Sequence, residues 1–285
     1  MGCFITVSDG CGMSVDSGQI TLRSVTKVFA SSDGQGTLEA LGPVDIDIAG
    51  GEFFSVVGPS GCGKSTLLDI IAGLSSPTTG EADFDGKPLT GDVPDGVGAV
   101  FQQDASFFWL NVWDNVAFGL RRKRVGAGEI RRRVSYALSF MGLTGFASAY
   151  PAQLSGGMRQ RVCIARTLVL KPRLLLLDEP FGALDQQTRL VMGDELLRVW
   201  REIRATVILI THSLEEAAML SDRIAVMSAR PGRFIDIVVT GWPRSRDSRI
   251  IADERFGGIT ARLWGSLREE SLKSLESGAV LDEHR

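Results

Sequence analysis

The strongest constraint on the fold of this chain is the glycine-rich segment Gly58–Ser65, which reads Gly-Pro-Ser-Gly-Cys-Gly-Lys-Ser. It fits G-x-x-x-x-G-K-[ST], a loop whose backbone N–H groups surround phosphate oxygens while its lysine reaches the β- and γ-phosphates. The apolar run 52–57 predicts a buried strand before the loop, and helical spacing from Lys64 to Leu74 predicts a helix after it. The dipole at the start of that helix favours anions. Because a predicted strand precedes the loop and a predicted helix follows it, an accidental glycine-rich turn is a poor explanation. The segment therefore indicates nucleoside triphosphate binding.

Four leucines, Leu174–Leu177, precede Asp178 and Glu179. The run predicts a buried strand that ends in two carboxylates. Beside a phosphate loop, Asp178 is expected to hold Mg²⁺ together with Ser65. Glu179 is then placed to deprotonate the attacking water, a form of general-base help that contributes about 10²–10⁴-fold. An isolated Asp-Glu pair is a weak signal, and the phosphate loop makes it a strong one.

A second helix start follows Leu154, where Ser155, Gly156 and Gly157 precede Met158. The two glycines leave backbone N–H groups accessible at the helix N-terminus, which is an anion-binding arrangement. One triphosphate does not need two such helix ends in one subunit, so the second indicates a partner's nucleotide. The alternative is an ordinary serine cap followed by flexible glycines.

Strand and helix patterns alternate at both ends of the chain, which predicts a mostly parallel sheet with helices on both faces. A helical pattern over about 104–170 interrupts them, and a further helix is expected over Asp194–Ile203. The segment 1–18 is expected to be a loose leader, and the polar segment 241–285 to hold one amphipathic helix around Leu263.

Composition excludes several classes. A net charge of −3 argues against a nucleic-acid binder. No apolar run reaches the ~20 residues that a membrane helix needs, and no signal peptide is visible. Four scattered cysteines give no disulfide framework, and two histidines are too few for a His/Cys metal cluster.

Together these motifs resemble the ATP-binding subunits of ATP-binding-cassette (ABC) transporters, over residues 19–240. The resemblance rests on Walker A at Gly58–Ser65, a Q-loop at Gln102, the signature at Leu154–Gln160, Walker B at Leu174–Glu179, a D-loop at Gly182–Asp185 and the switch residue His212. It implies an α/β P-loop NTPase of the ABC type: a mostly parallel sheet core, an N-terminal antiparallel β part and the inserted helical subdomain. It also implies a head-to-tail dimer in which each ATP lies between one subunit's Walker A and the other's signature.

The resemblance assigns roles to individual residues. Gln102 senses the γ-phosphate and Mg²⁺, Asp185 couples the two sites, His212 contacts the γ-phosphate, and Phe29 stacks on adenine, although a simple core or strand phenylalanine remains the alternative for Phe29. The implied nucleotide-binding residues are Phe29, Gly58, Pro59, Ser60, Gly61, Cys62, Gly63, Lys64, Ser65, Thr66, Gln102, Ser155, Gly156, Gly157, Asp178 and Asp185. The implied catalytic residues are Glu179, His212, Lys64 and Gln102, and the implied Mg²⁺ ligands are Ser65, Gln102 and Asp178.

A finer match rests on the segments Gly98–Asp104, Trp113–Leu120, Pro180–Asp185 with Gln187–Arg189, and Arg230–Arg233. These segments resemble the subunits that energise nitrate, sulfonate and taurine import. Two departures from that group are Ser106–Trp109, where it usually reads Leu-Leu-Pro-Trp, and Ser213, where it usually has Asp. The first lies in the segment that docks the membrane subunit by resemblance. Phe107, Phe108 and Trp109 are expected either to form an exposed apolar patch or to be buried.

The expected function is that of an ATPase, peripheral on the cytoplasmic face of the cell membrane, that drives an importer. Its implied partners are a second copy of itself, membrane-spanning permease subunits and, indirectly, a solute-binding protein. Alternatives are the motor of an exporter or lipid-transport system and a soluble ABC ATPase acting on DNA or ribosomes. The interval from Lys64 to Ser155 has no room for the long coiled coil typical of the last class. The transported solute is not encoded in this chain.

Overall fold

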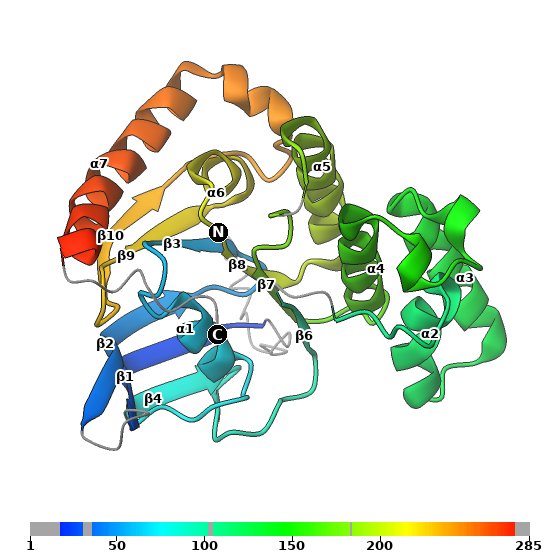
Figure 1. Cartoon of the computed structure of the whole chain (residues 1–285), viewed down its shortest axis with the longest axis horizontal. Coiled ribbons are helices and arrows are strands. Elements are labelled where there is room, and N and C mark those ends of the chain that lie inside the picture. The colour runs from blue at the N-terminus through cyan, green and yellow to red at the C-terminus, as the bar shows by residue number, and fades with distance from the viewer. Residues whose placement is uncertain (1–17, 31–35, 102–104, 183, 277–285) are drawn as a thin grey trace, which may run out of the picture.

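The structure, a computed structural model, describes residues 18–30, 36–101, 105–182 and 184–276 (Figure 1). Its strands are β1 Ile20–Ala30, β2 Thr37–Ile48, β3 Phe53–Val57, β4 Thr79–Phe84, β5 Lys87–Pro88, β6 Val97–Val100, β7 Leu174–Asp178, β8 Thr206–Ile210, β9 Arg223–Met227 and β10 Phe234–Val239. Its α-helices are α1 Lys64–Ile71, α2 Val112–Arg122, α3 Ala127–Phe140, α4 Gly156–Leu168, α5 Gln186–Ile203, α6 Leu214–Leu220 and α7 Glu254–Glu276. Short 3₁₀ turns are η1 Thr144–Phe146, η2 Pro151–Gln153 and η3 Ser248–Ala252.

The central sheet has the strand order β10-β9-β3-β8-β7-β6. Its strands pair in parallel except β10, which is antiparallel to β9. Every residue of β3, β7 and β8 is buried, as expected for parallel strands covered on both faces. This arrangement confirms the predicted mostly parallel α/β core.

The second sheet is antiparallel, with the order β2-β1-β4-β5. Residues 44–48 of β2 alternate buried and exposed side chains, because one face packs on the core and the other faces solvent. The Asp85-Gly86 turn after β4 leads directly into β5. This sheet is the antiparallel β part that the ABC resemblance implies.

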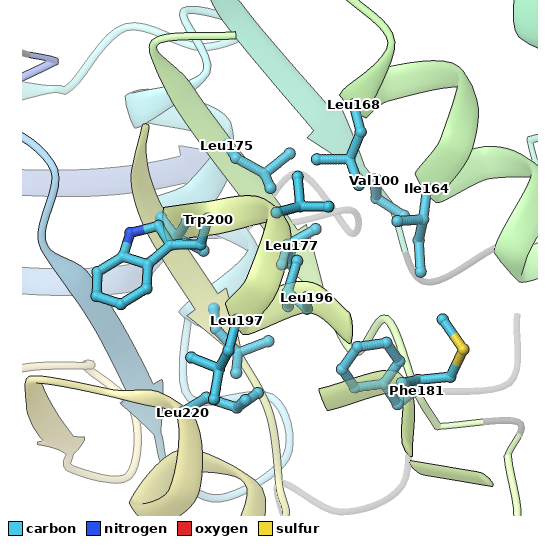
Figure 2. Close-up of a cluster of buried hydrophobic side chains, with 14 of the residues drawn as sticks. Val100, Ile164, Leu168, Leu175, Leu177, Phe181, Leu196, Leu197, Trp200 and Leu220 are labelled. Atoms are coloured by element: carbon cyan, nitrogen blue, oxygen red, sulfur yellow. The ribbon is translucent and has the colours of Figure 1, made fainter. Parts of the chain in front are cut away.

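The main hydrophobic core fills the space between the central sheet and helices α4, α5 and α6. Figure 2 shows side chains from these elements converging around β7, with Leu175 and Leu177 facing Ile164, Leu196 and Trp200. Phe53 of β3 meets Trp200 edge to face, with ring centroids 5.6 Å apart. Because β7 is anchored on both faces, the carboxylates that follow Leu177 start from a rigid strand.

Helices α2, α3 and α4 lie together beside the central sheet (Figure 1). Asn111 caps α2, and the buried Asn115 donates to and accepts from the backbone of Phe107 at 3.0 and 2.8 Å. That bracing shapes the turn before α2, in which Phe108 is 75% and Trp109 58% exposed. Of the two alternatives, exposed patch or buried cluster, the first is therefore correct for Phe108 and Trp109. Phe107 is half-buried against Phe118 and Arg166.

Two helix boundaries differ from the sequence-based expectation. Helix α1 ends at Ile71 rather than near Leu74, because Gly73 adopts a left-handed φ of 73° and Leu74 turns toward solvent. Helix α5 starts at Gln186, eight residues before the expected Asp194, because the Asp185 carboxylate caps it by accepting from Thr188 N at 3.0 Å. Among the described residues, no helix is long and apolar enough to cross a bilayer.

Candidate nucleotide site

The candidate site lies at the carboxyl ends of three adjacent strands, β3, β8 and β7. Strand β3 leads into Gly58–Ser65, β8 into His212, and β7 into Glu179. Because these strands are parallel neighbours, their ends meet at one edge of the sheet, where ligands bind in open α/β folds. The topology thus brings together segments more than 100 residues apart in the chain.

The side chain of Lys64 binds back to the start of the phosphate loop. Lys64 Nζ donates to the carbonyl oxygens of Gly58 and Pro59 at 2.9 and 2.8 Å, and the residue is buried. Gly63 has φ 108°, and a Cβ there would lie 2.6 Å from Ala40 O, so only glycine fits. At the start of α1 the N–H groups of the first turn have no carbonyl one turn earlier to bind, which leaves them available to an anion.

Ser65 and Asp178 meet at the base of the loop. Ser65 Oγ donates to Asp178 Oδ2 at 3.1 Å. Burial raises the pKa of Asp178, whereas the Ser65 hydroxyl and the Lys64 charge oppose that rise. A hydroxyl and a carboxylate side by side are oxygen ligands of the kind that Mg²⁺ prefers.

Glu179 and His212 face each other across the end of the sheet, with Glu179 Oε1 3.3 Å from His212 Nδ1. Glu179 has a left-handed φ of 46°, which an L-residue adopts only under tertiary constraint. Its N–H donates to Ile210 O at 2.9 Å, so β8 helps to impose this backbone geometry. The catalytic pair named from the sequence is thus in contact.

Behind His212, a buried bond joins the Thr211 hydroxyl to the Glu216 carboxylate. Thr211 Oγ1 also accepts from Ser213 N at 3.1 Å, which fixes the turn that carries the histidine. Burial raises the pKa of Glu216, while the Thr211 bond opposes that rise. The sequence pattern does not reveal the supporting role of Glu216, because that role depends on the turn between β8 and α6.

A cavity of about 170 Å³ opens between these groups. It is lined by Ala40, Ser60, Gly61, Gly63, Lys64, Ser65, Thr66, Asp178, Glu179, Ile210 and Arg230. Two cations, three hydroxyls and two carboxylates therefore converge on a space bounded by backbone N–H groups. Arg230 was not predicted as a site residue, because it follows β9 and lies 169 residues from its partner Gly61. A larger cavity of about 750 Å³ lies by Gly51, Arg173 and Arg204, near the opposite ends of the strands and away from Asp178 and Glu179.

Known proteins resemble this chain closely. The family model described as ABC transporter matches residues 41–182. The nitrate import ATP-binding protein NrtD of Synechocystis is 39% identical, over 90% of this chain and 98% of that protein. The chain belongs to the ABC transporter ATP-binding proteins. The taurine import ATP-binding protein TauB of Burkholderia thailandensis is 47% identical, over 76% of this chain and 82% of that protein. A solved dimeric ATP-binding cassette in a post-hydrolysis state, bound to ADP and Pi, matches with TM-score 0.71 at 34% identity, over 79% of this chain and 100% of that one.

As an ABC ATP-binding protein, the chain is an ATPase that uses ATP and Mg²⁺. Its own residues fit both. Lys64 and the N–H groups of the α1 start suit phosphate, and Ser65 with Asp178 suits Mg²⁺. A side chain at Gly63 would strike Ala40 O, so the loop is packed closely against the backbone of β2.

The ABC signature stands apart from this cavity. Ser155 caps α4, and its Oγ accepts from Met158 N at 3.3 Å. Gly156 is exposed, and a Cβ on Gly157 would contact Leu184 at 2.5 Å. Ser155, Gly156 and Gly157 do not line the cavity that holds Lys64 in the described part of the chain.

The remaining predicted residues fall in three places. Phe29 is 40% exposed on β1, with Lys27 Nζ 5.2 Å from its ring centroid. Cys62 is buried in the loop, and Asp185 is exposed at the start of α5, where the Thr188 hydroxyl lowers its pKa. Gln102 lies outside the described residues.

Proposed function

We propose that this chain is the ATP-hydrolysing subunit of an importer for nitrate, sulfonate, taurine or a related small solute. The observation that carries the proposal is the convergence of Lys64, Ser65, Asp178, Glu179 and His212 at one edge of the central sheet. The import proteins NrtD and TauB favour an importer over an exporter or lipid-transport motor. The solute class comes from those relatives.

In the proposed reaction Lys64 and the N–H groups of Gly61–Thr66 bind the phosphates of ATP. Ser65 and Asp178 hold Mg²⁺, and Gln102 joins them by family resemblance. The bound metal neutralises charge that develops on the phosphate oxygens. Glu179 Oε1 accepts the proton of the attacking water, and His212, 3.3 Å away, orients that carboxylate and contacts the γ-phosphate. Phe29 stacks on the adenine, and Asp185 couples the two sites.

The complete site needs two chains. Ser155, Gly156 and Gly157 begin a helix with accessible N–H groups outside the Lys64 cavity, so they bind the nucleotide held by a second copy. The dimeric state of the related ATP-binding cassette supports this head-to-tail arrangement. The division of the chain into a leader 1–18, an ABC domain 19–240 with its helical subdomain at about 104–170, and an extension 241–285 belongs to the same proposal.

The exposed rings of Phe108 and Trp109 support contact with a permease subunit. Their centroids are 4.7 Å apart at right angles, and both side chains face solvent. An apolar patch of this kind is a usual mark of a protein interface. We infer a peripheral location on the cytoplasmic face of the membrane, with a solute-binding protein acting from the other side.

The test is Glu179→Gln in the full chain. The amide cannot accept the proton, so hydrolysis should fall by about 10²–10⁴-fold. ATP binding, followed by equilibrium titration with a fluorescent analogue, should persist because Lys64 and the loop are intact. Glu215→Gln is the matched control, since Glu215 is exposed in the next helix and lines no part of the cavity. Near-normal hydrolysis by Glu179→Gln would remove Glu179 from the role of base.

A further inference from the structure

The loop Ser228–Arg233 joins β9 to β10 and has a rigid internal structure. Ser228 N donates to Arg233 O at 2.9 Å, and Arg233 N donates to Ser228 Oγ at 3.0 Å. The Ser228 hydroxyl also donates to the carbonyl oxygens of Ala229 and Pro231 at 2.9 and 3.0 Å. This loop, called here the RPG loop, is therefore held as a unit.

The RPG loop is seated on the phosphate loop. Arg230 Nε and Nη2 donate to Gly61 O at 3.0 and 2.7 Å. Gly232 approaches so closely that a Cβ there would overlap Cys62 O. Gly232 N also donates to Ala40 O at 3.0 Å, and Ala40 O is the atom that confines Gly63. Three contacts thus connect the RPG loop to the walls of the nucleotide cavity.

Arg230 binds the phosphate loop at a glycine, Gly61, whose backbone has high conformational freedom. Gly61 is the third residue of a turn closed by Cys62 N and Pro59 O at 3.4 Å, and its φ is 69°. A turn of this type relies on glycine, which is also the residue with the most conformational freedom to lose. A guanidinium on the Gly61 carbonyl fixes the plane of the following peptide bond. Binding phosphate then costs less conformational entropy.

The RPG loop is also attached to the C-terminal helix. Glu270 of α7 is only 6% exposed, and its Oε2 accepts from Ala229 N at 2.8 Å. Ala229 immediately precedes Arg230. A continuous series of bonds therefore leads from α7 through the RPG loop to Gly61, and Figure 1 shows the C-terminal end of α7 beside β9 and β10.

We propose that Arg230 is a positioning residue for the phosphate loop and that Glu270 holds the RPG loop in the position from which Arg230 binds Gly61. Docking of the C-terminal end of α7 and nucleotide binding are therefore coupled. The proposal rests on the proposed nucleotide site and adds a route by which the extension 241–285 regulates it. Coupling of this kind is reciprocal. If docking of α7 raises the nucleotide affinity by a given factor, nucleotide binding favours docking of α7 by the same factor.

The test measures MgADP and MgATP dissociation constants and kcat for the full chain. We expect Arg230→Ala to weaken both nucleotides by the same factor, on the order of 10-fold, because a charge-assisted bond to the loop is lost. Saturating ATP should leave kcat within about 2-fold, since Glu179 and His212 are untouched. Arg230→Lys should recover part of the affinity. Arg233→Ala is the matched control, an exposed arginine of the same loop that does not line the cavity.

The α7 arm uses Glu270→Ala and Glu270→Gln. Alanine removes the acceptor for Ala229 N and should weaken both nucleotides by about 3-fold or more, whereas glutamine keeps a carbonyl acceptor and should restore affinity. Hydrogen exchange of residues 266–272 should slow on addition of saturating MgADP in the wild type and not in Arg230→Ala. Unchanged nucleotide affinity in Arg230→Ala or in Glu270→Ala would overturn the coupling. A loss of affinity confined to MgATP, or an equal loss of affinity in the control Arg233→Ala, would also overturn it. Failure of the wild type itself to bind MgATP would instead overturn the proposed function.

Discussion

At the scale of single residues, Cys62 shows how a reactive side chain becomes inert inside a functional loop. Its thiol is buried and lies 3.9 Å from Lys64 Nζ. Burial raises the pKa of Cys62 above its ordinary value of 9.0, although the Lys64 charge favours the thiolate. Desolvation is the larger effect, so the thiol acts as a small apolar side chain that fills the space under the loop.

The reactivity of Cys62 tests this reading. In a chain carrying Cys3→Ser, Cys11→Ser and Cys163→Ser, iodoacetamide at pH 8 should modify Cys62 at least ~10-fold more slowly than in the guanidinium-unfolded chain. A raised pKa means that the folded thiol carries less thiolate at pH 8, so the rate should keep rising beyond pH 9. Fast alkylation that reaches its plateau below pH 8 would show that Lys64, and not burial, controls the thiol.

At the scale of elements, α7 is fixed to the central sheet by a charged contact as well as by apolar packing. Leu263 and Phe256 are buried against the core, and Arg262 Nε and Nη2 donate to the two carboxylate oxygens of Asp236 on β10 at 3.0 and 2.6 Å. Arg262 lowers the pKa of Asp236. The orientation of α7, and with it the place of Glu270, depends on this contact.

Asp236→Asn should loosen α7 at neutral pH. Because the folded pKa of Asp236 is lowered, its stabilisation is complete above the ordinary value of 3.8 and disappears as pH falls through the folded pKa. Because Arg262 is exposed, solvent screening keeps the stabilising effect of this pair small. Limited proteolysis within α7 should be faster than in the wild type at pH 7, whereas the difference in urea unfolding should shrink as the pH falls below 3.8. Glu269→Gln, on the exposed face of α7, is the control, and equal proteolysis of all three chains at pH 7 would refute the contact's contribution.

At the scale of the whole molecule, the two anion-binding helix starts have separate positions. The start of α1 belongs to the cavity with Lys64, and the start of α4 presents Ser155 and Gly156 elsewhere on the surface. A symmetric pair of chains that contact each other head to tail gives each cavity the other chain's α4. In the proposed dimer, the start of α4 thereby completes the partner's site.

Complementation between two inactive chains tests the composite site. Lys64→Ala removes one half, and Gly156→Asp places a carboxylate in the other, where a Cβ meets only Arg159 at 3.8 Å and the fold is not disturbed. Each variant alone should be inactive. An equimolar mixture should recover about a quarter of wild-type ATPase activity, since half of the dimers then contain one intact site. Gly128→Asp is the control, because its Cβ would meet nothing within 4 Å. A mixture as inactive as its components would contradict the head-to-tail assembly.

The sequence alone determined the features that depend on residue types at fixed spacing within one segment. A strand buried on both faces needs an unbroken apolar run, and helical spacing predicts a helix, so the strand before Gly58, the helix that begins at Lys64 and the buried strand at Leu174–Leu177 are confirmed. The local pattern also indicated Asp178 and Glu179 as candidates, and the family resemblance indicated His212. Neither could bring them together, because their meeting depends on the order β3-β8-β7.

Only the tertiary structure decided which distant groups support the site. Arg230 reaches Gly61 across 169 residues, and Glu270 reaches Ala229 across 41. The segment Arg230–Arg233 matches the importer group in sequence, but that match does not indicate which residues the segment contacts. The start of α5 was likewise misplaced, because a single capping carboxylate at Asp185 outweighs the weaker apolar periodicity before Asp194. Side-chain spacing encodes what each segment can do, whereas strand order and packing determine which segments act together.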